Sequence, residues 1–289
     1  MRTAAAWTSL PCCSASRRAA VADGAGAELN GVVRFEVKGA IALITLDRPD
    51  QRNCINAEVA GALRAAIRRL EADPSLRVGV LCGNGRVFCA GMDLKALSEG
   101  KVEEVLFGEG RFAGIVSLER RKPLIAAVQG AALAGGLEIM LSCDMAVAEE
   151  GTRFGIPEAR IGLVAAAGGV FRLAQRIPPA RARELVLTGA PFTTEEALAW
   201  GLLNRVVPEG EARAAALALA EEVLKSAPES VTEGLRLARL LELEAEQRAW
   251  PVSDDIIRRL MVSADAMEGA RAFIEKRPPV WSTPGDGTD

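Results

Sequence analysis

The stretch that most constrains this chain begins at Lys122, after which no charged residue occurs until Glu138. Its first part, Leu124 to Val128, is continuously apolar and partly β-branched, a pattern typical of a buried strand. A Gly135-Gly136 pair follows just before Glu138. Glycine lets backbone amides stand exposed where a helix begins. The order predicts a buried strand, a turn able to bind an anion, and an acid/base group beside it.

A second carboxylate, Glu158, follows Pro157 in another mostly apolar segment. Acidic side chains are rarely buried unless they are paired, and desolvation raises the pKa of a carboxyl group. A protonated acid and an ionised base could therefore coexist near neutral pH. Each acid also has a plain structural explanation: Glu138 could complement a helix dipole, and Glu158 could start a surface turn beside Arg160.

A turn of similar form runs from Phe88 to Asp93, where an apolar strand is followed by Gly91 and an expected helix start. Two amide-presenting turns could point at one oxygen atom, as an oxyanion hole requires. Cys89 and Cys143 are better interpreted as small core residues than as nucleophiles, because the chain contains no His to activate a thiol.

The composition excludes several kinds of chemistry. With no His and no Tyr, the chain cannot form Ser-His or Cys-His nucleophile systems, His-based metal sites or phenol acids. Proton transfer is left mainly to Asp, Glu, Lys or Cys. The net charge of -3, without long basic runs, argues against nucleic acid or an anionic membrane as the main partner. No apolar run reaches the roughly 18 residues that span a bilayer. Six cysteines without paired ligand spacing fit a reducing compartment, so we expect a cytoplasmic protein without a metal.

The chain divides into four predicted parts. Residues 1–29 are Ala-rich and read as a disordered leader, with a transit peptide or an over-extended start codon as alternatives. Residues 30–207 form the predicted α/β core, and residues 208–281 an all-helical region whose surplus of apolar faces suggests a subunit interface. Residues 282–289 are a Pro/Gly-rich loose tail. The segment 102–119 is ambiguous and could be a mobile helix over the site. The predicted C-terminal helices are Gly210 to Lys225, Ser230 to Leu241, Val252 to Val262 and Ala264 to Glu275.

A series of motifs runs along the chain: Asp47-Arg48-Pro49 with Arg52-Asn53, Phe88 to Asp93, Ala127-Val128-Gln129-Gly130, Gly135-Gly136-Leu137-Glu138, Cys143-Asp144, Phe154 to Glu158, Leu187-Thr188-Gly189 and Trp200 to Val207. These motifs resemble the crotonase, or enoyl-CoA hydratase/isomerase, superfamily, and the match runs in the family's order from about Val32 to Trp281. The resemblance implies a spiral of β-β-α turns with a helical C-terminal trimerisation region, and homotrimers commonly paired into hexamers. It implies acyl-CoA thioester substrates and no separate cofactor, since coenzyme A is part of the substrate.

The resemblance also implies roles for individual residues. The backbone amides of Met92 and Gly135 would hold the thioester oxygen as it becomes an enolate. Glu138 and Glu158 match both hydratase glutamates, which would position a water, deprotonate it as it attacks Cβ, and protonate Cα. Because both acids are present, an enoyl-CoA hydratase-type lyase is the preferred function. An enoyl-CoA isomerase and a non-catalytic acyl-CoA-binding protein remain as alternatives.

The sequence departs from the family pattern at several positions, and it also resembles one particular group within the family. Ala134 stands where a third Gly is usual, Met92 where Ala is common, and residues 164–167 replace a frequent Pro-containing turn. The segments 156–172 and 265–281 also look like carnitinyl-CoA dehydratases, which would make that reaction a further alternative. Arg52 and Lys276 are candidates for the CoA phosphates, with a solvated surface cation as the plain interpretation of each.

Overall fold

The structure is a computed structural model that describes residues 27–29, 31–93 and 102–282. The predicted leader, apart from its last three residues, and the predicted tail, apart from Ser282, lie outside these ranges. The main sheet has the order β1-β2-β3-β4-β5-β7-β9. β1 to β3 are antiparallel, and every pairing from β3 to β9 is parallel. Its strands are β1 (Ala27–Leu29), β2 (Val33–Lys38), β3 (Ile41–Leu46), β4 (Val78–Gly83), β5 (Leu124–Val128), β7 (Met145–Glu149) and β9 (Arg205–Val207).

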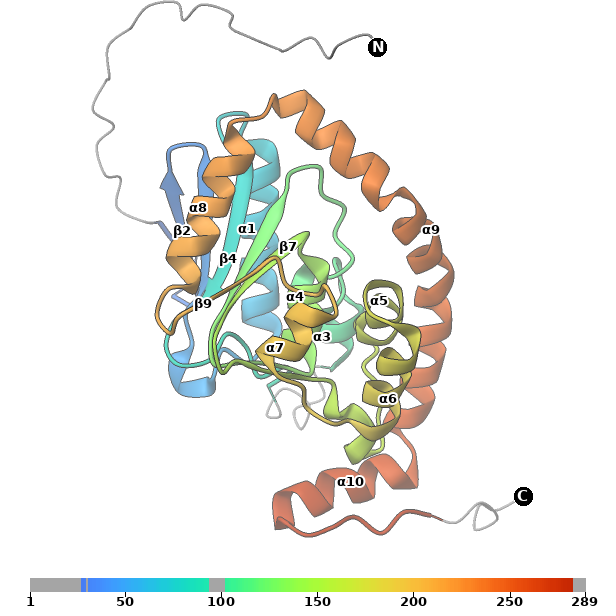
Figure 1. Cartoon of the computed structure of the whole chain (residues 1–289). Helices are drawn as coiled ribbons and strands as arrows, with labels where there is room; N and C mark the ends of the chain where they lie inside the picture. Colours follow the sequence, from blue (N-terminus) through green and yellow to red (C-terminus); the bar gives the residue numbers. More distant parts are fainter. Residues whose placement is uncertain (1–26, 30, 94–101, 283–289) are drawn as a thin grey trace, which may run out of the picture.

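The sheet is covered on both faces, which explains why its central strands are apolar without alternation. On one face, side chains such as Leu43 pack in a small core with α8 (Ala212–Leu224). On the other face, side chains such as Ile44 join the main core with α1 (Ala57–Ala72) and α4 (Gly135–Ser142). Figure 1 shows α8 and α1 on either side of the strands.

A second, two-stranded sheet positions the turns that the sequence singled out. It pairs β6 (Ala131–Leu133) with β8 (Arg153–Gly155) in parallel. Cys89 forms a bridge with Ala132 at its edge, and Phe154 forms one with Phe192. A 3-10 helix, η3 (Pro157–Ile161), follows β8. The Phe88 to Asp93 turn is thereby brought beside the start of α4.

Several short helices complete the core. The ambiguous 102–119 segment contains α3 (Val102–Phe107) and a 3-10 turn, η2 (Phe112–Gly114), rather than one long helix. Another 3-10 turn, η1 (Pro49–Gln51), lies between β3 and α1. The remaining helices of the core are α5 (Gly169–Arg176), α6 (Pro179–Thr188) and α7 (Thr194–Ala199).

The C-terminal region differs from the sequence prediction in one respect. The two helices expected on either side of residues 242–251 form one continuous helix, α9 (Pro228–Met261), with Pro251 inside it. The intervening residues are mostly good helix formers, and packing of Trp250 into the core opposes the cost of the proline. α9 runs along the outside of the molecule to α10 (Ala264–Glu275), which lies at one end (Figure 1).

The predicted α/β class is confirmed by this arrangement. The boundary at residue 207 stays a prediction, and α8, which follows it, packs directly on β4, β5 and β7. In the part of the chain that the structure covers, no helix is both long and apolar enough to cross a membrane.

Candidate active site

The two predicted amide turns lie against one another. A Cβ placed on Gly91 would be 3.3 Å from the backbone nitrogen of Gly135 and 3.0 Å from the Cβ of Ala134. Around them, the Leu133 amide donates to the Cys89 carbonyl (3.1 Å). Residues separated by more than forty positions in the chain therefore share one small region.

Glycine is required for this approach. A Cβ on Gly136 would lie 2.1 Å from the Cys89 carbonyl oxygen, and one on Gly135 would lie 2.3 Å from the Phe112 ring. Contacts this short leave no room for a side chain. These two glycines allow α4 to begin in direct contact with the Cys89 backbone and the Phe112 ring.

Within the described chain, the N–H groups of both candidate amides lie outside the hydrogen bonds of their own elements. The parallel bridge between Ile55 and Met92 uses the Gly91 carbonyl and the Asp93 amide, so the Met92 N–H points the other way. At Gly135, the first residue of α4, the N–H has no acceptor one turn back. Within the described ranges, neither the Met92 nor the Gly135 N–H donates a hydrogen bond.

Glu138 lies in the first turn of α4 and is almost fully buried, with 3% of its surface exposed. Its Oε1 accepts a hydrogen bond from the Gly169 N–H at the start of α5 (2.8 Å). A Cβ on Gly169 would lie 2.9 Å from that oxygen, so this glycine also permits the contact. Glu138 is thus held by the N-terminus of a second helix.

Glu158 lies in the 3-10 helix η3. Its carbonyl accepts from the Leu163 amide (2.9 Å), while its Oε2 is buried and has no hydrogen-bond partner in the described protein. A buried carboxylate oxygen without a partner is costly and is often found where a ligand binds.

The two carboxyl groups interact, and burial raises the pKa of both. For Glu138, burial is the largest cause, opposed by hydrogen bonds from the Gly169 and Ala167 amides and by the charge of Arg172. For Glu158, burial is again the largest cause, and the charge of Glu138 raises its pKa further. Glu138 therefore ionises more readily than Glu158, and between the two ionisations the pair holds one proton.

The loop before α1 supports the Met92 turn. Arg48 forms an ion pair with Asp93 (3.1 Å) and donates to the Cys54 carbonyl (2.7 Å). Asn53 is buried in a left-handed conformation, and its side chain bonds the Asn84 and Val87 carbonyls and accepts from the Arg48 amide. The Arg48-Asn53 motif of the sequence is therefore a scaffold for the turn.

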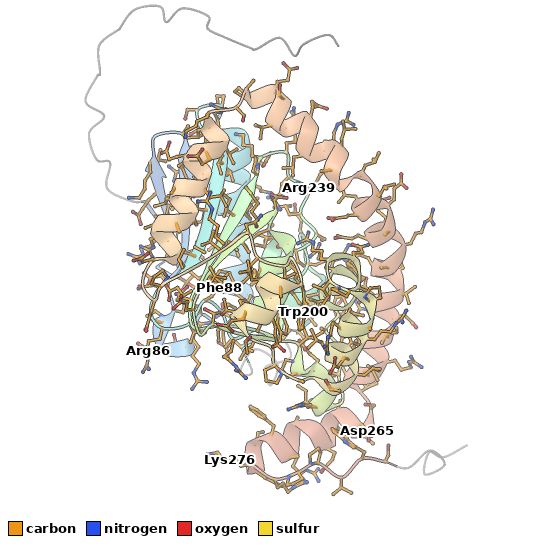
Figure 2. The ribbon with its side chains drawn as sticks, in the orientation of Figure 1. Arg86, Phe88, Trp200, Arg239, Asp265 and Lys276 are labelled. Atoms are coloured by element: carbon orange, nitrogen blue, oxygen red, sulfur yellow. The ribbon has the colours of Figure 1, made fainter. Side chains whose placement is uncertain are left out.

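Arg52 and Lys276, the two candidates for the CoA phosphates, are both exposed and far apart in the chain. Arg52 ends η1, and its carbonyl accepts from Ala90 in the first amide turn (3.1 Å). Lys276 ends α10, with Asp265 at the other end of that helix (Figure 2). No contact joins the two cations in the described chain, and their role stays a prediction.

The cysteines of the core are poor nucleophiles. Cys89 and Cys143 are buried, and burial raises the pKa of each thiol to about 12. Across the described ranges, no group of three or more Cys, Asp and Glu side chains is arranged to hold a metal ion.

Three neighbours of the site could not be found from motifs. They are Gly169, which donates to Glu138; Phe112, whose ring packs against Gly135; and Arg172, whose charge opposes protonation of Glu138. A charged residue in the apolar stretch after Gly169 was the one available signal, and it does not identify a partner.

Comparisons with known proteins agree with this geometry. Residues 36–284 match the enoyl-CoA hydratase/isomerase family, and the chain belongs to that family. A carnitinyl-CoA dehydratase of Proteus mirabilis is 40% identical over 86% of this chain and 97% of its own length, and one of Salmonella typhi is 41% identical over 84% and 95%.

Solved structures show the same fold. A carnitinyl-CoA hydratase from Mycobacterium avium superposes with a TM-score of 0.82 at 44% identity, covering 87% of this chain and 98% of the other. An enoyl-CoA hydratase/isomerase from Pseudoalteromonas atlantica superposes with a TM-score of 0.78 at 31% identity, covering 87% and 100%. The crotonase-like fold predicted from the sequence is confirmed.

Proposed function

We propose that this chain is a hydro-lyase that adds water across the 2,3 double bond of an enoyl-CoA thioester, or removes it from a 3-hydroxyacyl-CoA. The observation that carries the proposal combines two amides, of Met92 and Gly135, that donate no hydrogen bond within the described residues, with two interacting carboxyl groups, of the buried Glu138 and the half-buried Glu158. An oxyanion hole and an acid/base pair are what hydration of a conjugated thioester requires.

In the first step, the Met92 and Gly135 amides donate to the thioester oxygen. Negative charge develops there as water attacks Cβ and the electrons of the double bond move toward the carbonyl. Amides that are already oriented need no rearrangement when this charge appears. The positive end of α4, at Gly135, adds to the stabilisation of the enolate.

The two carboxyl groups divide the proton transfers. Glu138, which ionises more readily, takes a proton from water as its oxygen bonds to Cβ. Glu158, which holds the shared proton, gives it to Cα as the enolate collapses. One proton enters the pair and one leaves it, so transfer from Glu138 to Glu158 restores the starting state. Dehydration follows the same steps in reverse.

The substrate and the assembly have further proposed features. Arg52 and Lys276 would neutralise phosphates of the CoA moiety. The chain would form a homotrimer or a dimer of trimers, supported by exposed apolar residues on α9 and α10 such as Leu241 and Ile274. In this proposal the reaction needs no separate cofactor, and a cytoplasmic location fits the four cysteines that are free in the described residues.

The function is tested by incubating the protein with crotonyl-CoA and longer enoyl-CoAs while following the absorbance of the conjugated thioester. We expect the absorbance to fall, with oxygen from isotope-labelled water in the product. Migration of the double bond without labelled oxygen would indicate an isomerase. Tight binding of CoA esters with unchanged absorbance would contradict catalysis.

Carnitinyl-CoA dehydration is the second candidate, favoured by the names of the relatives at 40–41% identity. The trimethylammonium group of that substrate would require an acidic or aromatic environment. The aromatic pair Phe171 and Trp250 is already in contact with the guanidinium groups of Arg111 and Arg172. Relative kcat/KM for carnitinyl-CoA and crotonyl-CoA separates the two candidates.

A further inference from the structure

An arginine is buried directly behind the candidate acid/base pair. Arg172, in the first turn of α5, is only 4% exposed. Its Nε and Nη2 donate to the two carboxylate oxygens of Glu246 on α9, both at 2.7 Å. Its Nη2 also donates to the Val116 carbonyl (2.5 Å). A buried bidentate ion pair is costly to form and costly to break, so its position is informative.

Arg172 contacts segments next to both parts of the candidate site, the acid/base pair and the oxyanion hole. On one side, it follows the Gly168-Gly169 turn, whose amide at Gly169 holds Glu138. On the other side, Val116 belongs to the turn that begins at Phe112, and the Phe112 ring packs against Gly135. One guanidinium group thus connects the carboxylate to the segment behind the oxyanion hole.

The third nitrogen of the guanidinium faces the same turn. Nη1 of Arg172 is buried without a hydrogen-bond partner in the described protein, and it lies 2.9 Å from the position of a Cβ on Gly168. Two charged side chains from neighbouring elements act on Glu138: Glu158 of η3 and Arg172 of α5. Glu246 of α9 forms the ion pair with that arginine. The net charge near Glu138 therefore depends on whether Glu246 balances Arg172.

We infer that Arg172 is a positioning residue that holds the Gly168-Gly169 turn against Glu138 and favours the ionised form of that acid, while Glu246 on α9 limits the effect. The inference rests on the proposed hydro-lyase function. In this inference, α9 contributes to the reaction through the Glu246–Arg172 ion pair and not by contacting the substrate.

A purely structural ion pair makes a different prediction. Loss of either partner would then lower stability and activity together, without a directed change in pH dependence. If the pair acts on Glu138, the two partners have opposite effects: Arg172→Gln removes a positive charge, whereas Glu246→Gln leaves that charge unbalanced.

The test measures kcat/KM against pH for the full-length enzyme and three variants. In Arg172→Gln we expect the acidic limb to move to higher pH by about 0.5–1 pH unit, with kcat lowered about tenfold or more. In Glu246→Gln we expect the acidic limb to move to lower pH. Arg172→Lys, which keeps the charge, should restore a limb close to that of the wild type.

Two matched controls are available on α9. Glu242→Gln breaks an ion pair with Arg176, also on α5, that is partly exposed. Arg239→Gln breaks a buried ion pair with Asp144 that also ties α9 to the core. Neither pair is among the charges that shift the pKa of Glu138, so we expect lower stability without a displaced pH profile.

A direct titration separates failure of this inference from failure of the proposed function. The carboxyl carbon of Glu138, assigned with Glu138→Gln, is followed by NMR in 13C-glutamate-labelled protein. We expect its titration midpoint to rise in Arg172→Gln and to fall in Glu246→Gln, whatever reaction is catalysed. If Arg172→Gln does not fold, Arg172→Lys and Glu246→Gln still give opposed expectations: no displacement and a lower midpoint. Displacement in the same direction for Arg172→Gln and Glu246→Gln, or none in Glu246→Gln, would overturn the inference; a wild type without turnover would overturn only the proposed function.

Discussion

The surroundings of Glu138 and Glu158 differ more than the similarity of the two side chains suggests. Glu138 is fixed at several points, with the Gly169 amide on its oxygen and the Arg172 charge behind it. Glu158 lies on a short 3-10 helix, with an oxygen that has no partner in the described protein and α10 packed against its backbone. Glu138 is therefore held by groups of the core, whereas the 3-10 helix that carries Glu158 packs against the peripheral helix α10.

The difference shows how one protein gives two chemically identical groups different tasks. Hydrogen bonds to a carboxylate favour its ionised form, whereas burial beside another carboxylate favours the protonated form. Both acids lie beside another carboxyl group and have raised pKa values, but Glu138 also accepts hydrogen bonds from the Gly169 and Ala167 amides. The comparison predicts that substitutions outside the site affect Glu138 and Glu158 differently.

The largest effect is expected when either acid is replaced. Glu138→Gln and Glu158→Gln should each reduce turnover about 10²- to 10⁴-fold, because each removes a proton transfer. Steady-state kinetics with crotonyl-CoA measures the loss, and Glu150→Gln, at an exposed acid, is the control. A near-normal rate in either variant would remove that residue from the mechanism.

A smaller effect, confined to the Glu158 side, is expected from α10. Gly269 packs so closely on η3 that a Cβ would lie 2.4 Å from the Ile161 carbonyl oxygen. Gly269→Ala should displace η3 and lower kcat about tenfold, since small misplacements of a catalytic group are costly. The control is Gly234→Ala on α9, where a Cβ meets nothing within 4 Å. An equal loss in both variants would show that α10 does not position Glu158.

The raised carboxyl pKa values also predict how stability depends on pH. The pKa of Glu138 is raised to about 7 and that of Glu158 to about 8, above the unperturbed value of 4.5. The folded state then binds more protons than the unfolded state between these limits, so the contribution of the pair to stability falls as pH rises from about 4.5 to 8.

Removing one of the two charges should therefore stabilise the protein at alkaline pH. We expect Glu138→Gln to raise the free energy of unfolding by about 1–3 kcal/mol at pH 8.5, with less effect at pH 5. Urea denaturation at the two pH values measures the difference. If Glu138→Gln instead lowered the free energy of unfolding, relative to the wild type, more at pH 8.5 than at pH 5, burial would not be the cause of the raised Glu138 pKa.

The smallest effect is expected at Ala134, before α4. Ala134 has φ 51° and ψ -127°, a conformation that L-residues rarely adopt. Ala134→Gly removes steric strain of about 1–2 kcal/mol but adds unfolded-state entropy of about 0.5–1 kcal/mol. We expect a net stabilisation of about 0.5–1 kcal/mol in urea denaturation and little change in activity. Clear destabilisation would mean that the Ala134 methyl group contributes packing that exceeds the strain.

Much of the fold was predictable because it depends on local patterns. The strand at Leu124 to Val128 follows from its continuous apolar run, and the amide turns follow from glycine. The C-terminal helices were predicted less well: separate helices were expected over Ser230 to Leu241 and Val252 to Val262, but Trp250 packs into the core and one helix continues through Pro251. A local rule failed where a distant contact was stronger.

The candidate site shows the same division. The sequence alone determined which groups are available for chemistry, because a chain without His or Tyr leaves acids such as Glu138 and Glu158 for proton transfer, and its glycines mark where backbone amides can be exposed. The tertiary structure decided their surroundings: Gly169 and Arg172 reach Glu138, and Glu246 reaches Arg172 from 74 positions away. A carboxyl pKa depends on burial and on charges within a few ångströms, and only folding brings those charges together.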